Sequence, residues 1–328
     1  MAELALAVAQ IPDSLPTPLL DAIRNVVVVA EKKRVYTGRG GEIVRAAMCR
    51  LIECQCLAHH TISRKAALRL LQTVDECMKH PNDIIQAAAV AALRALAAHA
   101  LSDPEPAVLD RLPKTYIQKL QSEENPAVRR GLALALGALP RTLLCGGGDE
   151  LLSAILDALS TASKQEKQVA KRDAETRRNA VMGLTEVCLT VGVGARVPLV
   201  VQQTEAGTLL ATAAAPDATW ASRLRAEALP GMNAQQFQVA WDAIMCATHD
   251  YATDNRGDVG SWVRKAACEG VERVLRYLHV QATYQQALVS GAHSAACTAL
   301  VSSMAGVRSA RWYPASVWCL FGRFTDLE

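Results

Sequence analysis

Five segments of the chain follow one nine-residue pattern: VRAAMCRLI (44–52), IQAAAVAAL (85–93), VRRGLALAL (128–136), TRRNAVMGL (176–184) and VRKAACEGV (263–271). Successive segments start 41, 43, 48 and 87 residues apart, and the last interval has room for two units. A period in the forties is typical of chains built from stacked pairs of helices. The pattern therefore predicts an all-α chain in which each segment lies in the inner helix of one repeat.

Arginine occupies the second place of four segments, and glutamine occupies it in the remaining one, at Gln86. We interpret the arginines as structural repeat positions; they are Arg45, Arg129, Arg177 and Arg264. Small residues in the middle of each segment allow neighbouring helices to approach closely, so that a stack buries a core that no single unit could bury. We expect a HEAT/armadillo-type α-solenoid of antiparallel helix pairs.

The composition agrees with a helical scaffold and excludes several other classes. Of the 328 residues, 51% are hydrophobic and 4% aromatic, and the net charge of +3 is too small to indicate a broad nucleic-acid surface. No apolar run reaches the ~18 residues expected of a membrane span, and the start, MAELALAVAQIPDS (1–14), lacks the basic region of a secretory signal. We expect a soluble cytosolic protein whose ten cysteines are buried small hydrophobes.

Breaks in the periodicity divide the chain into five parts. We expect an incomplete helical unit over 1–35, HEAT-like repeats over 36–191 and 231–310, a divergent insertion or degenerate repeat over 192–230, and an atypical, truncated C-terminal segment over 311–328. Turn residues and caps predict helices over 19–29, 42–56, 63–79, 83–100, 109–120, 126–139, 149–163, 174–191, 235–248, 262–279 and 284–303. Ser63 is the expected N-cap of one helix, and Pro126 the first-turn proline of another.

Few residues suggest a catalytic, metal-binding or phosphate-binding site. Cys54, Cys56, His59 and His60 have ligand types suited to zinc, but they fall at one helix end rather than in two pairs separated by a loop, so we favour core cysteines before a polar terminus. The glycine runs 38–41 and 146–148 follow no strand and lack the spacing of a phosphate-binding loop. No cofactor, metal site or catalytic residue is expected, and an enzyme is poorly supported.

The most distinctive stretch of the sequence is HDYATDNRGDVGSW (249–262), which we expect to be a loop between two helices. Its aspartates sit four residues apart, which does not match a calcium-binding loop. Asp258 can cap the following helix or bond to Arg264, and exposed side chains can contact a partner. The candidate partner-binding residues are Asp250, Asp254, Arg256, Asp258 and Trp262.

Four stretches, in order, resemble the tubulin-folding cofactor D (tubulin-specific chaperone D) family. They are YTGRGGEIVRAAMCRLIE (36–53), GLALALGALPRTLL (131–144), AETRRNAVMGLTEVCLTVGV (174–193) and DYATDNRGDVGSWVRKAA (250–267). The last is long and is not a general HEAT feature. Members of the family are far longer, and the matching stretch lies in their C-terminal half.

The resemblance implies a cytoplasmic, cytoskeleton-associated scaffold without catalytic residues of its own. It implies binding of β-tubulin and the α/β-tubulin heterodimer, cooperation with other tubulin-folding cofactors and with an Arf-like small GTPase, and stimulation of GTP hydrolysis by tubulin within the cofactor complex. We expect the concave row of inner helices, with its arginines, and the 250–258 loop to face tubulin. Nucleic acid and membrane are not expected partners.

Two other readings remain open from the residues alone. A general HEAT-repeat adaptor, such as a phosphatase or transport scaffold, would share the periodicity but would not retain tubulin. A metal enzyme built on Cys54, Cys56 and the adjacent histidines would contain stoichiometric zinc.

Overall fold

The computed structural model describes residues 16–35, 40–58, 62–100, 106–166, 172–193, 200–203, 209–212 and 231–290, together with the single residues 3, 7 and 60. The expected C-terminal segment 311–328 and the second half of the predicted helix 284–303 lie outside the described residues, as do His59 and much of 192–230. The described helices are α2 (Thr17–Lys32), α3 (Gly41–Leu57), α4 (Arg64–Met78), α5 (Asp83–Ala100), α6 (Pro106–Ser122), α7 (Pro126–Ala138), α8 (Arg141–Cys145), α9 (Gly148–Ala162), α10 (Ala174–Val191), α12 (Ala234–Ala247) and α13 (Gly260–Ser290).

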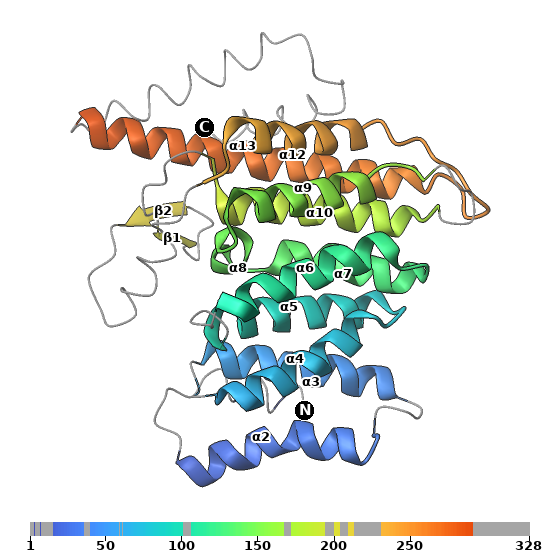
Figure 1. Cartoon of the computed structure of the whole chain (residues 1–328), viewed down its shortest axis with the longest axis vertical. Coiled ribbons are helices and arrows are strands. Elements are labelled where there is room, and N and C mark those ends of the chain that lie inside the picture. Colours follow the sequence, from blue (N-terminus) through green and yellow to red (C-terminus); the bar gives the residue numbers. More distant parts are fainter. Residues whose placement is uncertain are drawn as a thin grey trace.

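The helices stack along the long axis of the molecule, from α2 at one end to α12 and α13 at the other (Figure 1). The inner layer consists of α3, α5, α7, α10 and α13, which pack on one another in that order and carry the five nine-residue segments. In the second layer α4 packs on α3 and α5, while α6, α9 and α12 pack on one another in succession. The predicted fold class, an all-α solenoid, is confirmed.

The nine-residue pattern has a common burial profile in the five inner helices. Its fifth, eighth and ninth positions are buried in every copy. The eighth position is small in four copies, as Ala92, Ala135, Gly183 and Gly270. A Cβ atom built on Gly183 would lie 2.6 Å from the carbonyl oxygen of Ala133, so α7 and α10 approach too closely for a side chain there. The small residues thus set the spacing of the stack, as the sequence predicts.

Polar caps start the inner helices at a fixed distance before the pattern. Asn82, Asn125 and Asp173 each lie three residues before the first residue of a segment, and each accepts a hydrogen bond from a backbone N–H of the helix that follows. The predicted cap at Ser63 is confirmed by its hydrogen bond from the Ala66 N–H, and Pro126 lies at the start of α7 as predicted. These caps satisfy backbone donors that the helix itself leaves unpaired.

Three features differ from the sequence prediction. First, α13 continues to Ser290, so the predicted break between a helix 262–279 and a helix starting at 284 is wrong; no glycine or proline lies between Gly270 and Gly291 to interrupt it. Second, the short helix α8 follows Pro140 and was not predicted. Third, β1 (Val200–Gln203) and β2 (Leu209–Thr212) form an antiparallel pair within 192–230. A parallel bridge between Val193 and Met232 closes the base of this segment.

Candidate functional site

The loop 250–259 joins α12 to α13 and contains a tight turn. The backbone groups of Asp254 and Gly257 exchange two hydrogen bonds of 3.0 Å, and Gly257 has a φ of 102°, which an L side chain rarely adopts. The Asp254 carboxylate accepts a hydrogen bond of 2.7 Å from the Arg256 backbone N–H, which holds the turn from inside. The turn projects the side chains of residues 254–256 into solvent.

Asp258 performs both of the local roles that the sequence predicts for it. Its Oδ1 accepts a hydrogen bond of 3.1 Å from the Ser261 N–H in the first turn of α13. Its Oδ2 accepts a hydrogen bond of 2.6 Å from Nη2 of Arg264. The other terminal nitrogen of Arg264, Nη1, donates to the Asp250 carbonyl oxygen. The hydrogen bond from Arg264 lowers the pKa of Asp258, so this carboxylate is ionised at neutral pH. Asp258 therefore shapes the loop as well as lying on its surface.

Asp250 joins the loop to the preceding inner helix. Its Oδ2 and Oδ1 lie 2.7 and 3.3 Å from Nε and Nη2 of Arg177 on α10. The two side chains are 4% (Arg177) and 12% (Asp250) exposed, so the pair lies inside the stack. A second arginine of the pattern, Arg129, is also buried. The expectation that the pattern arginines face a partner is therefore wrong for Arg129 and Arg177, whose charges are used between helices.

The same kind of link occurs one unit earlier. Arg130 on α7 makes a two-pronged ion pair with Asp173, the cap of α10, at 2.8 and 2.7 Å. One unit before that, the buried Gln86 on α5 donates to the Ala127 carbonyl oxygen in the first turn of α7. The links of Gln86 and Arg130 run from the start of one inner helix to the start of the next, and the link of Arg177 runs to the loop that precedes α13. The stack is thus fastened along one edge, where the inner helices begin.

At this edge the 250–259 loop meets α10 in a cluster that we call the charged edge: Arg130, Glu175, Asp254, Arg256 and Trp262. Glu175 pairs with both Arg130 and Arg256, the second contact measuring 3.2 Å. Arg256 also pairs with Asp254 at 2.8 Å and lies over the Trp262 ring, 5.0 Å from its centre. The guanidinium of Arg256 is thereby held in place while 43% of its side chain stays exposed.

An exposed aromatic side chain lies beside the charged edge. Tyr251 is 70% exposed, and the Arg264 guanidinium lies 4.6 Å from the centre of its ring. Sequence reasoning did not single out Tyr251, Glu175, Arg130 or Asp173. A signal was present for Asp173, because it occupies the same place before its segment as Asn82 and Asn125. The contacts of Glu175 with Arg130 and with Arg256 of the loop leave no comparable trace in the sequence.

Two further carboxylates of this region, Asp254 and Asp173, have lowered pKa values. The hydrogen bond from Arg256 lowers the pKa of Asp254. Burial would raise the pKa of Asp173, but the hydrogen bonds from Arg130 and Thr176 and the charge of Arg130 outweigh it, and the pKa lies below its ordinary value. The arrangement is a set of positioned ion pairs with an aromatic flank, which suits recognition of a protein surface.

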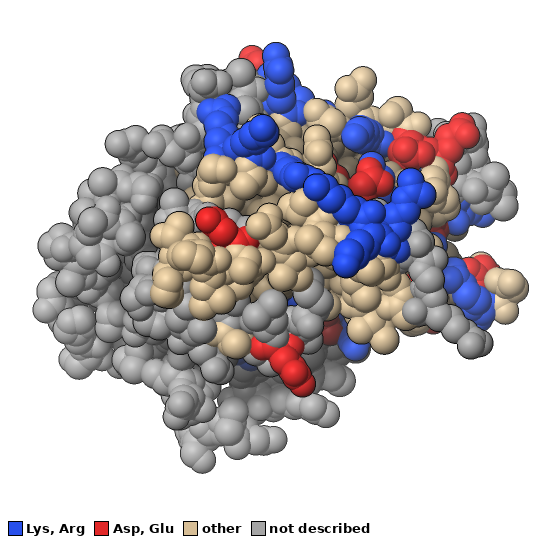
Figure 2. All heavy atoms as spheres, turned by 90° about the horizontal axis from the view of Figure 1, so that it is seen from below, with Lys and Arg blue, Asp and Glu red and all other residues tan. Residues whose placement is uncertain are grey.

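Three further observations concern the rest of the described chain. Viewed from the α2 end, Lys and Arg side chains form a band across the described surface, with Asp and Glu mostly at its margins (Figure 2). Exposed basic residues of α2, α3 and α4 at this end are Lys32, Arg50, Arg64, Lys65 and Arg69. Within the described ranges, no three His, Cys, Asp or Glu side chains converge as metal ligands, and no helix is long and apolar enough to cross a bilayer.

Comparison with known proteins finds a relative of this chain among the curated sequences. No family model matches the chain, and no solved structure matches it. Tubulin-specific chaperone D of Dictyostelium discoideum is 22% identical in an alignment 335 positions long, and this alignment includes 81% of this chain. The match covers 21% of the chaperone, so the chain spans about a fifth of its length. By this match, the chain is similar in sequence to one part of tubulin-specific chaperone D.

Proposed function

We propose that this chain is a non-catalytic scaffold of the tubulin-folding cofactor kind, which binds β-tubulin and the α/β-tubulin heterodimer. The observation that carries the proposal is its similarity to tubulin-specific chaperone D over 81% of its length. An array of stacked helices supports such a role because it presents a long continuous surface to a folded partner.

The surface that we assign to tubulin contact is the charged edge together with Tyr251. Arginine, tyrosine and tryptophan are the residues most enriched at energetically important interface positions. Arg256 is held by Asp254, Glu175 and Trp262 before any partner arrives, so binding costs little side-chain entropy there. Pre-positioned charge beside an exposed aromatic ring favours both orientation and affinity.

The finer parts of the proposal follow from the family resemblance. The chain acts with other tubulin-folding cofactors in assembling and disassembling the heterodimer, and it stimulates GTP hydrolysis by tubulin as part of that complex. An Arf-like small GTPase is a further partner, and the place of action is the cytoplasm and the cytoskeleton. The GTP chemistry belongs to tubulin, which agrees with a described surface built from ion pairs rather than from a nucleotide site.

Size-exclusion chromatography of the full chain with tubulin tests the proposal. We expect co-elution of the chain with isolated β-tubulin or with the heterodimer. The Arg256→Glu and Tyr251→Ala variants should elute separately from tubulin while keeping the melting temperature of the wild type. Lys265→Glu is the matched control, because Lys265 is 79% exposed on α13 and pairs only weakly with Glu269, at 3.9 Å.

A general HEAT-repeat adaptor remains the second candidate. The observation in its favour is the small share of the chaperone that the chain matches, 21%. A folded, monodisperse sample that retains neither β-tubulin nor the heterodimer would favour the adaptor and would contradict tubulin binding by this chain. Loss of folding in the Arg256→Glu variant would instead assign Arg256 to the stability of the loop.

A further inference from the structure

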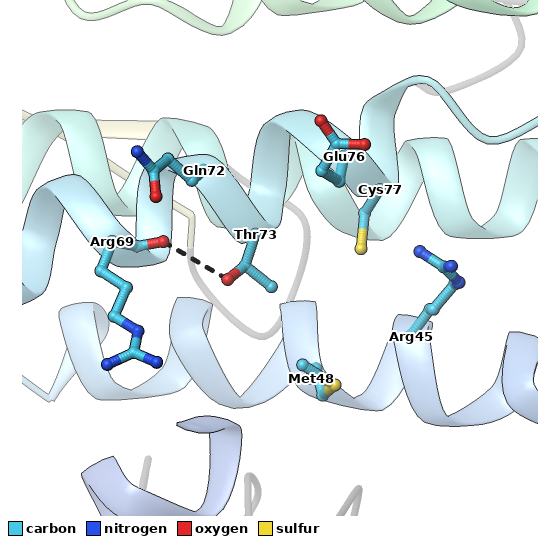
Figure 3. Close-up of a pocket in the computed structure, with 7 residues that line it drawn as sticks. All are labelled: Arg45, Met48, Arg69, Gln72, Thr73, Glu76 and Cys77. Carbon is cyan, nitrogen blue, oxygen red and sulfur yellow. Dashed lines mark hydrogen bonds between the residues drawn. The ribbon is translucent and has the colours of Figure 1, made fainter. Parts of the chain in front are cut away.

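A cavity of about 410 Å³ lies between α3 and α4, at the other end of the stack from the charged edge. Its lining residues are Arg45, Met48, Arg69, Gln72, Thr73, Glu76 and Cys77. In Figure 3 the Cys77 sulfur points from α4 toward α3, and the Arg45 guanidinium reaches toward it from α3. A sulfur atom therefore borders an accessible space next to a fixed positive charge.

A second thiol contacts the first. Cys49 lies on α3 one turn after Arg45, is fully buried, and interacts with the Cys77 side chain. The positive charge of Arg45 acts on the Cys77 side chain. Cys77 has only 2% of its surface exposed, but it lines the cavity, whereas Cys49 does not. The two thiols consequently differ in access although they touch each other.

From this geometry we propose that Cys77 is a reactive thiol that exchanges with low-molecular-weight disulfides, and that Cys49 resolves the product into a disulfide bond between α3 and α4. The pair supplies both of the parts that such chemistry needs, a thiol that borders an open cavity beside a cation and a second thiol next to it. The pattern arginine of this unit, Arg45, thereby acquires a role that its buried counterparts Arg129 and Arg177 do not have.

The reaction proceeds by two exchanges. The Cys77 thiolate attacks one sulfur of a disulfide RSSR, so that a Cys77–SR bond forms and one RS⁻ leaves. Cys49 then loses its proton to solvent and attacks the Cys77 sulfur, which forms the Cys49–Cys77 bond and releases the second RS⁻. The two thiolates take up the two protons that the cysteines lose. The protein is oxidised by two electrons, and RSSR is reduced to two RSH.

The groups that face Cys77 support its part as the attacking thiol. The hydrogen bond with Cys49, together with the charge of Arg45, lowers the pKa of Cys77 against the opposing effects of burial and of Glu76. The pKa of Cys49 is raised by the same hydrogen bond and by burial. Burial likewise raises the pKa of Cys56 and of Cys188, to about 12 in each, so these two serve as unreactive references within the same chain.

The test uses the wild-type chain and oxidised glutathione. Trypsin separates the two cysteines into peptides 46–50 and 70–79, each with a single cysteine. After oxidation and quenching with N-ethylmaleimide, we expect mass spectrometry to show these two peptides joined by a disulfide. Before oxidation, brief alkylation at pH 7 should label Cys77 at least about tenfold faster than Cys56 or Cys188.

Three variants separate the roles of Cys49 and Arg45. Cys49→Ala should stop the reaction at the glutathione adduct of Cys77, and Arg45→Gln should slow alkylation of Cys77 while Arg45→Lys keeps most of the rate. Equal labelling of Cys77 and Cys56 in the wild type, or disulfides that join other peptides instead of 46–50 and 70–79, would overturn the proposal. Both wild-type readouts decide the matter even if a variant fails to fold.

Discussion

Replacing Asp250 by alanine should destabilise the stack at the junction of α10 and α13. The Asp250 carboxylate is paired with Arg177 through two contacts of 2.7 and 3.3 Å, and the Arg177 side chain is only 4% exposed. The same carboxylate accepts a hydrogen bond of 3.0 Å from the Ala252 N–H, which shapes the start of the loop. The variant therefore leaves a guanidinium buried without its counter-charge and releases the loop backbone.

The expected cost follows from that geometry. Removing one partner of a buried ion pair costs roughly 3–5 kcal/mol, and the 12% exposure of Asp250 places the loss near the lower end, about 3 kcal/mol. For a chain of this size the melting temperature should fall by about 6 °C. Because a buried pair can often be replaced as a whole at little cost, adding Arg177→Met to the Asp250→Ala variant should restore part of the loss.

Thermal and urea unfolding of both variants measure the effect. Asp254→Ala is the matched comparison, because Asp254 belongs to the same loop but its contacts are exposed, and it should lower the melting temperature much less than Asp250→Ala does. Equal stability of the Asp250→Ala and Asp254→Ala variants would refute the assignment of Asp250 to the interior. The pairing with Arg177 would be refuted if the double variant lost more unfolding free energy than the Asp250→Ala and Arg177→Met variants lose in sum.

Three further predictions concern packing, pH and binding. Gly131→Ala should lower the free energy of unfolding by about 1–3 kcal/mol, because its Cβ would lie 2.0 Å from the backbone oxygen of Met78; urea unfolding checks this. Asp173 has a lowered pKa, so its stabilisation is complete above the ordinary aspartate pKa of about 3.9 and is lost as the pH falls through its own lower value. Stability measured from pH 5 to pH 3 should consequently decline less steeply in Asp173→Asn than in the wild type, and equal slopes would show that the pair with Arg130 contributes nothing. Arg256→Glu should weaken tubulin binding at least about tenfold in a titration, as expected for a central interface arginine, without changing the melting temperature.

Much of the fold could be predicted because its determinants are local. The helices 83–100 and 174–191 were predicted with the bounds that α5 and α10 have, since a polar cap precedes each segment and Gly192 ends the second. Where no such signal exists, the prediction failed. Residues 279–284 contain nothing that stops a helix, yet the weakening of the apolar pattern there suggested a break that α13 does not have.

The candidate site was predictable only in its local part. Asp258 and Ser261 are three residues apart, so the cap and the neighbouring contact with Arg264 could be expected from spacing. The pairs Arg177–Asp250 and Arg256–Glu175 join residues 73 and 81 positions apart, and nothing in the sequence selects those partners among the many charges. Only the stacking of successive units brings them together, which is why Asp250 was assigned to the surface although it lies inside.

Hydrogen–deuterium exchange of the full chain, alone and with tubulin, tests the central claim most directly. If tubulin contacts the charged edge and Tyr251, amides of residues 251–262 should exchange more slowly in the complex, while those of α2 and α3 keep their rates. A complex in which 251–262 exchange as in the free chain, with protection elsewhere, would contradict the assigned surface. Unchanged exchange throughout, at tubulin concentrations in large excess, would contradict tubulin binding itself.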